Sequence, residues 1–163
     1  RLCGWNVRQY VRLQWPAKWS QVVISFALVI AFLAASDGLT YLLGREIVPE
    51  FMVNALESAS LPLLVFAVVI AAPIGEEVIF RGFILRNFMP SAGPLVAIVI
   101  SSAVWAVIHL QYDLYGIVTV FLGGLLLGGI YWRTRSLSLC IALHAFWNLI
   151  ATVEAFVYVN YLR

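Results

Sequence analysis

Five apolar stretches dominate the chain and restrict the folds that it can adopt. Crossing the ~30 Å hydrocarbon core of a bilayer takes about 20 apolar residues in a helix, and the third and fourth stretches are short for this. Of the 163 residues, 63% are hydrophobic and 11% charged, whereas soluble domains average about half and a quarter. The sequence therefore predicts an all-α, polytopic transmembrane bundle of about five spans. The predicted spans are residues 20–43, 61–85, 94–109, 115–132 and 137–161.

Residues 1–19 form a leader in which basic and aromatic side chains alternate. Such a mixture beside a membrane is typical of an interfacial anchor on the cytoplasmic side, and residues 20–163 are then the transmembrane domain. A secretory signal ending near residues 34–36 is the alternative interpretation, and the four later apolar stretches predict a polytopic protein in either case. The basic and aromatic residues of the leader are Arg1, Arg8, Arg12, Lys18, Trp5, Tyr10, Trp15 and Trp19.

The basic residues also predict the orientation of the chain. With the N-terminus in the cytoplasm, the inner side receives eight of the ten Lys and Arg residues, and the outer side receives Arg45 and Arg163. The excess of Lys and Arg on the cytoplasmic side of membrane proteins therefore predicts a multi-pass protein with a cytoplasmic N-terminus. The composition excludes a nucleic-acid-binding arm, so the expected partners are the lipid bilayer and a substrate.

Two further features exclude other kinds of site. The chain has only two cysteines, Cys3 and Cys140, which is too few for a disulfide framework or a four-cysteine zinc site. A cluster of four glycines lies in the fourth predicted span, where small residues let helix backbones approach closely, and we predict that they serve packing rather than cofactor binding. These glycines are Gly123, Gly124, Gly128 and Gly129.

Six strongly polar side chains lie within three of the apolar stretches, where each ionisable group costs roughly 3 kcal/mol. Glu77 precedes Arg81 by four residues, the favourable order for a helical ion pair. His144 and Asn148 share a helix face at the same spacing. At ~1.5 Å per residue, the three stretches carry these groups to a similar depth, which predicts one shared site. The six residues are Glu76, Glu77, Arg81, His109, His144 and Asn148.

The residue types indicate hydrolysis at a carbonyl group. A carboxylate beside imidazoles can hold and deprotonate a water molecule, directly or with a metal ion. Because Arg81 neutralises Glu77, Glu76 is left as the base with an adjustable pKa. A neutral imidazole and an amide, those of His144 and Asn148, can donate hydrogen bonds to a developing oxyanion.

Three motifs in chain order resemble the signatures of the CPBP (Abi) family, which contains type II CAAX prenyl proteases and bacteriocin-processing proteins. The family patterns are Glu-Glu-x-x-x-Arg, Phe-x-x-x-His and His-x-x-x-Asn. Here they correspond to the Glu76–Arg81 segment, to Trp105 with His109, and to His144 with Asn148, within a core of about residues 61–161. Trp105 stands where the family usually has Phe, and we expect this change to alter packing more than chemistry.

The resemblance implies an intramembrane endopeptidase with an α-helical core and a peptide or membrane-protein substrate. It implies that Glu76 activates water together with His109. It also implies that His144 and Asn148 stabilise the oxyanion. We expect the substrate to enter from the cytoplasmic or the membrane side.

The resemblance leaves the cofactor open, because the family is described both as a metalloprotease and as glutamate-dependent and metal-free. Glu76, His109 and His144 are candidate zinc ligands, with water as the fourth. The chain has no His-Glu-x-x-His motif, the usual zincin spacing, and we slightly prefer a metal-free, Glu-activated water. By the same resemblance, Arg81 holds Glu77 and the geometry of its helix.

Two other functions are compatible with this pattern. One is a non-proteolytic membrane scaffold or immunity protein of the same fold. The other is an ion-coupled transporter with Glu76 and His109 as relay groups, which the lack of an internal repeat disfavours. For a peptidase, CAAX processing and bacteriocin or peptide maturation are both open, and the compact chain indicates a bacterial inner membrane. The other acidic residues are predicted to be solvated or interfacial: Asp37, Glu46, Glu50, Glu57, Asp113 and Glu154.

Overall fold

The computed structural model describes residues 6–16 and 18–163, and over these residues the chain is helical without strands, as predicted. The leader contributes α1 (Val7–Tyr10), and the first long helix is α2 (Trp19–Leu42). A loop then leads to α3 (Glu50–Ser58), an amphipathic helix that begins after Pro49. Arg1, Cys3 and Trp5 of the predicted leader lie outside the described residues.

Residues 61–92 form one helical span of 32 residues. Its backbone changes between two hydrogen-bonding patterns, because α-helical segments alternate with wider π-helical ones. Pro73 lies near its middle and has no N–H to donate, which disturbs the α-helical pattern. Short π-helical segments inside α-helices are frequently found at functional sites. The segments are α4 (Leu61–Val65), η1 (Phe66–Ala71), α5 (Ala72–Glu77), η2 (Val78–Leu85) and α6 (Arg86–Ala92).

Three more helices complete the bundle, and their ends follow from local sequence. Gly93, at φ 79°, turns the chain into α7 (Pro94–Val107). The Asp113 side chain accepts a hydrogen bond from the N–H of Gly116 and caps α8 (Leu114–Thr134). The Ser136 side chain does the same for α9 (Leu137–Val157), which continues as η3 (Tyr158–Leu162). Serine and aspartate at these positions satisfy N–H groups that the helix leaves unpaired.

In the described part of the chain, four helical segments are long and apolar enough to cross a membrane, and a fifth is shorter. The shorter one is α7, whose 14 residues extend about 21 Å, less than the ~30 Å of a hydrocarbon core. The bundle is thus roughly the predicted one, with four long spans and one short helix. His109, predicted to close the third span, lies in the turn after α7. The four long segments are Trp19–Leu42, Leu61–Ala92, Leu114–Thr134 and Leu137–Leu162.

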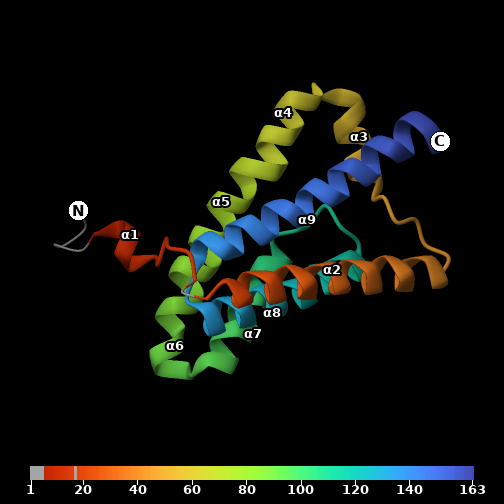
Figure 1. Cartoon of the computed structure of the whole chain (residues 1–163). Helices are drawn as coiled ribbons and strands as arrows, with labels where there is room; N and C mark the ends of the chain where they lie inside the picture. Colours follow the sequence, from red (N-terminus) through yellow and green to blue (C-terminus); the bar gives the residue numbers. More distant parts are fainter. Residues whose placement is uncertain (1–5, 17) are drawn as a thin grey trace.

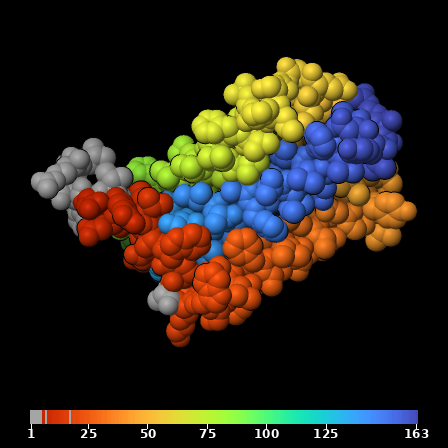
Figure 2. All heavy atoms as spheres, turned by 45° about the horizontal axis from the view of Figure 1, so that its top comes forward, coloured from red at the N-terminus to blue at the C-terminus, as the bar shows by residue number. Residues whose placement is uncertain are grey.

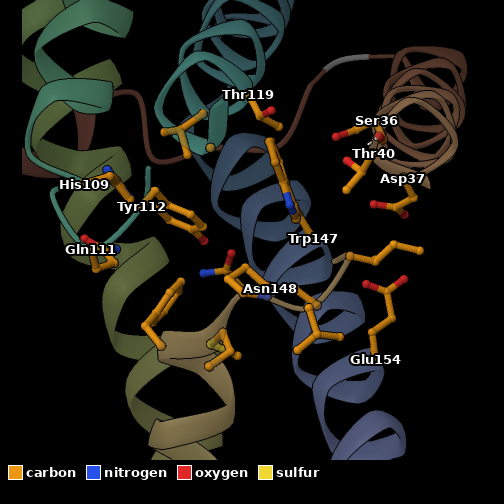
Figure 3. Close-up of a pocket in the computed structure, with 18 of the residues that line it drawn as sticks. Ser36, Asp37, Thr40, His109, Gln111, Tyr112, Thr119, Trp147, Asn148 and Glu154 are labelled. Carbon is orange, nitrogen blue, oxygen red and sulfur yellow. Dashed lines mark hydrogen bonds between the residues drawn. The ribbon is translucent and has the colours of Figure 1, made fainter. Parts of the chain in front are cut away.

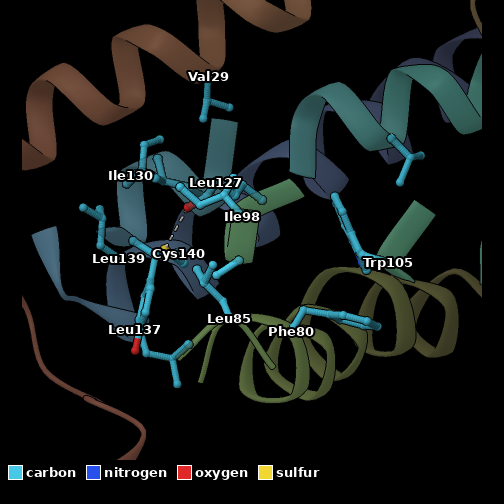
Figure 4. Close-up of a cluster of buried hydrophobic side chains, with 14 of the residues drawn as sticks. Val29, Phe80, Leu85, Ile98, Trp105, Leu127, Ile130, Leu137, Leu139 and Cys140 are labelled. Atoms are coloured by element: carbon cyan, nitrogen blue, oxygen red, sulfur yellow. Dashed lines mark hydrogen bonds between the residues drawn. The ribbon is translucent and has the colours of Figure 1, made fainter. Parts of the chain in front are cut away.

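The helices pack so that α9 contacts both α2 and the long segment that contains α5 (Figures 1 and 2). Helix α7 packs along α8. A cluster of buried apolar side chains fills the space where these helices meet, and the Cys140 thiol lies within it, directed at the Leu127 carbonyl (Figure 4). Members of this cluster include Val29, Phe80, Leu85, Ile98, Trp105, Leu127, Ile130, Leu137 and Leu139.

Three of the four clustered glycines of α8, residues 123, 124, 128 and 129, lie at close helix contacts, as the packing interpretation predicts. A Cβ atom at Gly123 would come within 2.2 Å of the Trp147 ring, and one at Gly124 within 2.9 Å of Ser102. At Gly128 the nearest atom would be 3.0 Å away, whereas a Cβ at Gly129 would meet nothing within 4 Å. The glycines therefore let α7 and α9 approach α8 closely.

The described part of the leader packs against one end of the bundle. The Tyr10 hydroxyl donates to the Asn87 side chain over 2.7 Å, and the Arg86 guanidinium lies over the Tyr10 ring. The N–H of Leu137 donates to the carbonyl of Arg12 over 3.0 Å. Figure 1 shows α1 and α6 at this end, with α3 and the C-terminus at the other.

Candidate active site

The predicted ion pair between Glu77 and Arg81 lies in the interior of the structure. Their side chains are 0% and 1% exposed, and Nη1 of Arg81 donates to Oε1 of Glu77 over 2.7 Å. Arg81 also donates to the Gly124 carbonyl over 3.3 Å, and its guanidinium lies 4.5 Å from the centre of the Trp105 ring. A buried charge pair is stable when further hydrogen bonds satisfy it. Arg81 makes such a bond and joins η2 to α8, whereas Oε2 of Glu77 is buried and accepts no hydrogen bond within the described residues.

Glu76, which directly precedes Glu77 in the sequence, has a different environment. Its side chain is 24% exposed, and its Oε2 atom accepts a hydrogen bond from the indole Nε1 of Trp105 over 2.5 Å. Neighbouring helical residues point about 100° apart, which explains how Glu77 is fully buried while Glu76 reaches accessible space. The sequence analysis expected Trp105 to affect packing more than chemistry. That expectation is incomplete, because the indole bonds directly to the carboxylate predicted to be the base.

His109 is fixed by the carbonyl group of Trp105. Its Nδ1 atom lies 2.7 Å from that oxygen, and since a carbonyl only accepts, Nδ1 carries the proton. In the neutral ring, Nε2 then bears a lone pair. This Nε2 atom lies 3.9 Å from Oε2 of Glu76.

His144 is oriented in a similar way by Glu77. Its Nδ1 atom lies 3.0 Å from Oε1 of Glu77, so the neutral ring again presents Nε2 as an acceptor. That atom also lies 3.9 Å from Oε2 of Glu76. Both imidazoles contact Trp105 edge to face, at ring-centre distances of 5.3 Å for His109 and 5.2 Å for His144. Three separate elements thus direct two imidazole nitrogens and one carboxylate oxygen toward each other.

Asn148 is held by the long helix opposite α9. Its amide nitrogen donates to the Val68 carbonyl over 2.8 Å. In the π-helical pattern of η1, the N–H of Ala72 bonds to the carbonyl of Ala67, so the carbonyl of Val68 faces Pro73, which has no N–H. Asn148 supplies the missing donor. One N–H of the predicted oxyanion donor is therefore engaged with the backbone, and the second stays available.

A cavity of about 990 Å³ connects these residues (Figure 3). Glu76, His109, His144 and Asn148 line it, as does Tyr112 from the turn between α7 and α8. Five acidic residues predicted to be solvated or interfacial also line the cavity, so they border the space around the site. They are Asp37, Glu46, Glu50, Asp113 and Glu154.

The candidate zinc ligands do not form a preset metal site. Within residues 6–16 and 18–163, no group of three or more His, Cys, Asp or Glu side chains is arranged to hold a metal ion. The Glu76 oxygen nearest the imidazoles of His109 and His144 already accepts the Trp105 hydrogen bond.

One residue of this site, Tyr112, and one contact of Trp105 could not be predicted from the sequence. Trp105 lies four residues before His109, but the hydrogen bond from its indole depends on the approach of Glu76. Tyr112 had no signal, because a tyrosine in a polar turn is ordinary at a membrane surface. Its place in the cavity depends on how the turn packs against α3 and α8.

Comparison with known proteins identifies a family. The family model of type II CAAX prenyl endopeptidase Rce1-like proteins matches residues 58–150, more than half of the chain. The matched region contains all six residues predicted from the sequence, together with Trp105. No curated protein and no solved structure matches the chain.

Proposed function

Because this chain belongs to the type II CAAX prenyl endopeptidase Rce1-like family, we propose that it is an intramembrane endopeptidase in which Glu76 activates the attacking water. The family supports a membrane-embedded protease acting on a peptide substrate. One observation carries the finer assignment. The Nε2 atoms of His109 and His144 both lie 3.9 Å from Oε2 of Glu76, on the wall of an accessible cavity.

In the proposed reaction, a water molecule lies between the Glu76 carboxylate and the lone pair on Nε2 of His109. Glu76 takes one proton as the water oxygen bonds to the carbonyl carbon of the scissile peptide. The carbonyl π electrons move to the oxygen and form a tetrahedral oxyanion. Protonated Glu76 then gives its proton to the leaving nitrogen as the C–N bond breaks, releasing a carboxylic acid and an amine.

The remaining residues hold this arrangement in place. Asn148 turns its second N–H toward the oxyanion. His144, whose neutral imidazole the sequence predicts to be a second donor, has its Nδ1 engaged with Glu77 and presents the lone pair of Nε2 instead. Arg81 holds Glu77 through a hydrogen bond, and Glu77 in turn orients His144. Such preorganised groups act strongly in a site shielded from bulk water.

We propose a CAAX-type peptide as the first substrate class to test, since the family name specifies it. Maturation of a bacteriocin or another membrane-associated peptide is the second candidate, because no contact among the described residues makes the cavity specific for a prenyl chain. A membrane scaffold or immunity protein of the same fold would use the same buried ion pair without needing the accessible carboxylate of Glu76.

The test is cleavage of a farnesylated CAAX peptide by the full chain in proteoliposomes, followed by mass spectrometry. Glu76→Gln keeps the size of the side chain and removes the base, and we expect activity to fall by roughly 10²–10⁴-fold. Glu57→Gln, at an exposed ion pair with Arg163, is the matched control and should retain activity. Activity should also survive a metal chelator. Cleavage by Glu76→Gln at the wild-type rate would contradict the proposal, and loss of activity with the chelator would contradict the metal-free mechanism.

A further inference from the structure

Tyr112 is tied to the site through the turn that carries His109. The N–H of Tyr112 donates to the carbonyl of His109 over 3.1 Å, and the centres of the Tyr112 and His109 rings lie 6.1 Å apart. The same turn is closed by Asp113, which caps α8 and forms an ion pair with Arg45. The position of Tyr112 relative to His109 is thus set by several contacts.

The Tyr112 ring is also held on two sides. Phe51 of α3 contacts it edge to face, with ring centres 4.8 Å apart. On the other side lies Gly116, where a Cβ atom would come within 2.7 Å of the ring. The absence of a side chain at Gly116 lets the ring pack directly on α8. The ring therefore has little freedom to rotate away from the cavity.

The hydroxyl group of Tyr112 extends into the cavity toward Asn148 (Figure 3). Among the described residues, no side chain or backbone group forms a hydrogen bond with it. Burial, together with the negative charge of Glu76, raises the pKa of Tyr112 to about 12. The hydroxyl is consequently a protonated, unengaged hydrogen-bond donor at physiological pH.

The proposed reaction needs such a donor. In their neutral forms His109 and His144 both present Nε2 as an acceptor, and the proton that Glu76 has taken from water is destined for the leaving nitrogen. Asn148 already gives one N–H to the Val68 carbonyl. An oxyanion in this cavity would therefore be surrounded mostly by acceptors, which would destabilise it.

The geometry points to Tyr112 as a further catalytic residue, whose hydroxyl donates a hydrogen bond to the oxyanion of the tetrahedral intermediate. The hydroxyl keeps its proton throughout, so no additional bond is formed or broken. Together with the second N–H of Asn148, it forms a two-donor oxyanion site. This inference rests on the proposed peptidase function, because it assigns a role within that reaction.

The test compares Tyr112→Phe with wild type in the proteoliposome assay with the farnesylated CAAX peptide. This change removes one hydroxyl and keeps the ring packing. We expect kcat to fall about 100-fold, in the range for loss of one oxyanion donor, with KM changed less than about threefold. The matched control is Tyr115→Phe, which removes a hydroxyl bonded to Thr40 over 2.8 Å and should leave kcat unchanged.

Each result has a defined meaning. A Tyr112→Phe enzyme with wild-type kcat overturns the inference, and so does a variant with a markedly lower Tm, since the hydroxyl would then have a structural partner. If wild type is active and Glu76→Gln is inactive, the proposed function stands whatever Tyr112→Phe does. If Glu76→Gln remains active, the proposed function itself fails.

Discussion

At the scale of single residues, Trp105 connects more of the site than any motif residue. Its indole N–H bonds to Glu76, its ring contacts both imidazoles, and its flat face receives Arg81. Its carbonyl oxygen also fixes the tautomer of His109. A phenylalanine could keep the ring contacts but not the bond to the carboxylate. Trp105 therefore positions the base as well as packing the core.

We predict that Trp105→Phe lowers kcat by roughly three- to tenfold and leaves KM nearly unchanged. The variant retains aromatic packing but loses one hydrogen bond, worth about 0.5–1.5 kcal/mol net, which corresponds to roughly two- to tenfold in rate. Steady-state kinetics with the CAAX peptide measures kcat and KM separately. The control is Trp132→Phe, because Trp132 is partly buried and lies near the C-terminal end of α8. An unchanged kcat in Trp105→Phe would show that the indole N–H does not position Glu76.

At the scale of elements, the contact between α8 and α9 depends on glycine. Trp147 of α9 lies against Gly123 and contacts Phe32 of α2 edge to face. A methyl group at Gly123 would displace this ring, whereas the same group at Gly129 has open space. The two glycines therefore offer a matched pair in one helix.

We predict that Gly123→Ala destabilises the protein by about 1–3 kcal/mol, the usual cost of overpacking. Gly129→Ala should be neutral or slightly stabilising, because alanine favours helix more than glycine does. Thermal unfolding of both variants in the same detergent measures the difference in Tm. Equal Tm values for the two variants would contradict the close approach of α8 and α9.

Much of the element pattern could be predicted from the sequence, because a bilayer leaves long apolar stretches few alternatives to helix. The ion pair of Glu77 with Arg81 could also be predicted, because helical spacing alone brings the two side chains together. The hydrogen bond from Asn148 to Val68 could not be predicted, because it depends on a π-helical segment and a proline on another helix. The position of Tyr112 likewise depends on tertiary contacts of a turn.

At the scale of the whole molecule, the cavity and the leader lie toward opposite ends of the bundle. Exposed residues of the cavity wall, among them Glu46 and Gln111, follow α2 and α7. The leader instead contacts Asn87 and Leu137 at the other end. If the N-terminus is cytoplasmic, as the basic residues predict, this part of the cavity faces the outer side. A substrate then enters from the outer side or from the membrane; of the two sides expected from the sequence, the cytoplasm and the membrane, only the membrane fits this orientation.

We predict that Glu46→Cys reacts with a membrane-impermeant maleimide in intact cells. Ser91→Cys, exposed on α6 at the leader end, should react only after the membrane is permeabilised. Both variants are made with Cys3 and Cys140 replaced by Ser, and labelling is read from protein mass. The reverse pattern of labelling would place the cavity on the cytoplasmic side and the N-terminus outside.

The central claim is that Glu76 and His109 act as a unit on one water molecule. A double-mutant cycle on kcat/KM for the CAAX peptide tests it directly, with Glu76→Gln, His109→Gln and the double variant. Residues that act as a unit show strongly non-additive losses. We predict that the double variant is at most a few times slower than the slower single variant. Losses that multiply would mean that the two side chains act independently, and the account of a shared site would be wrong.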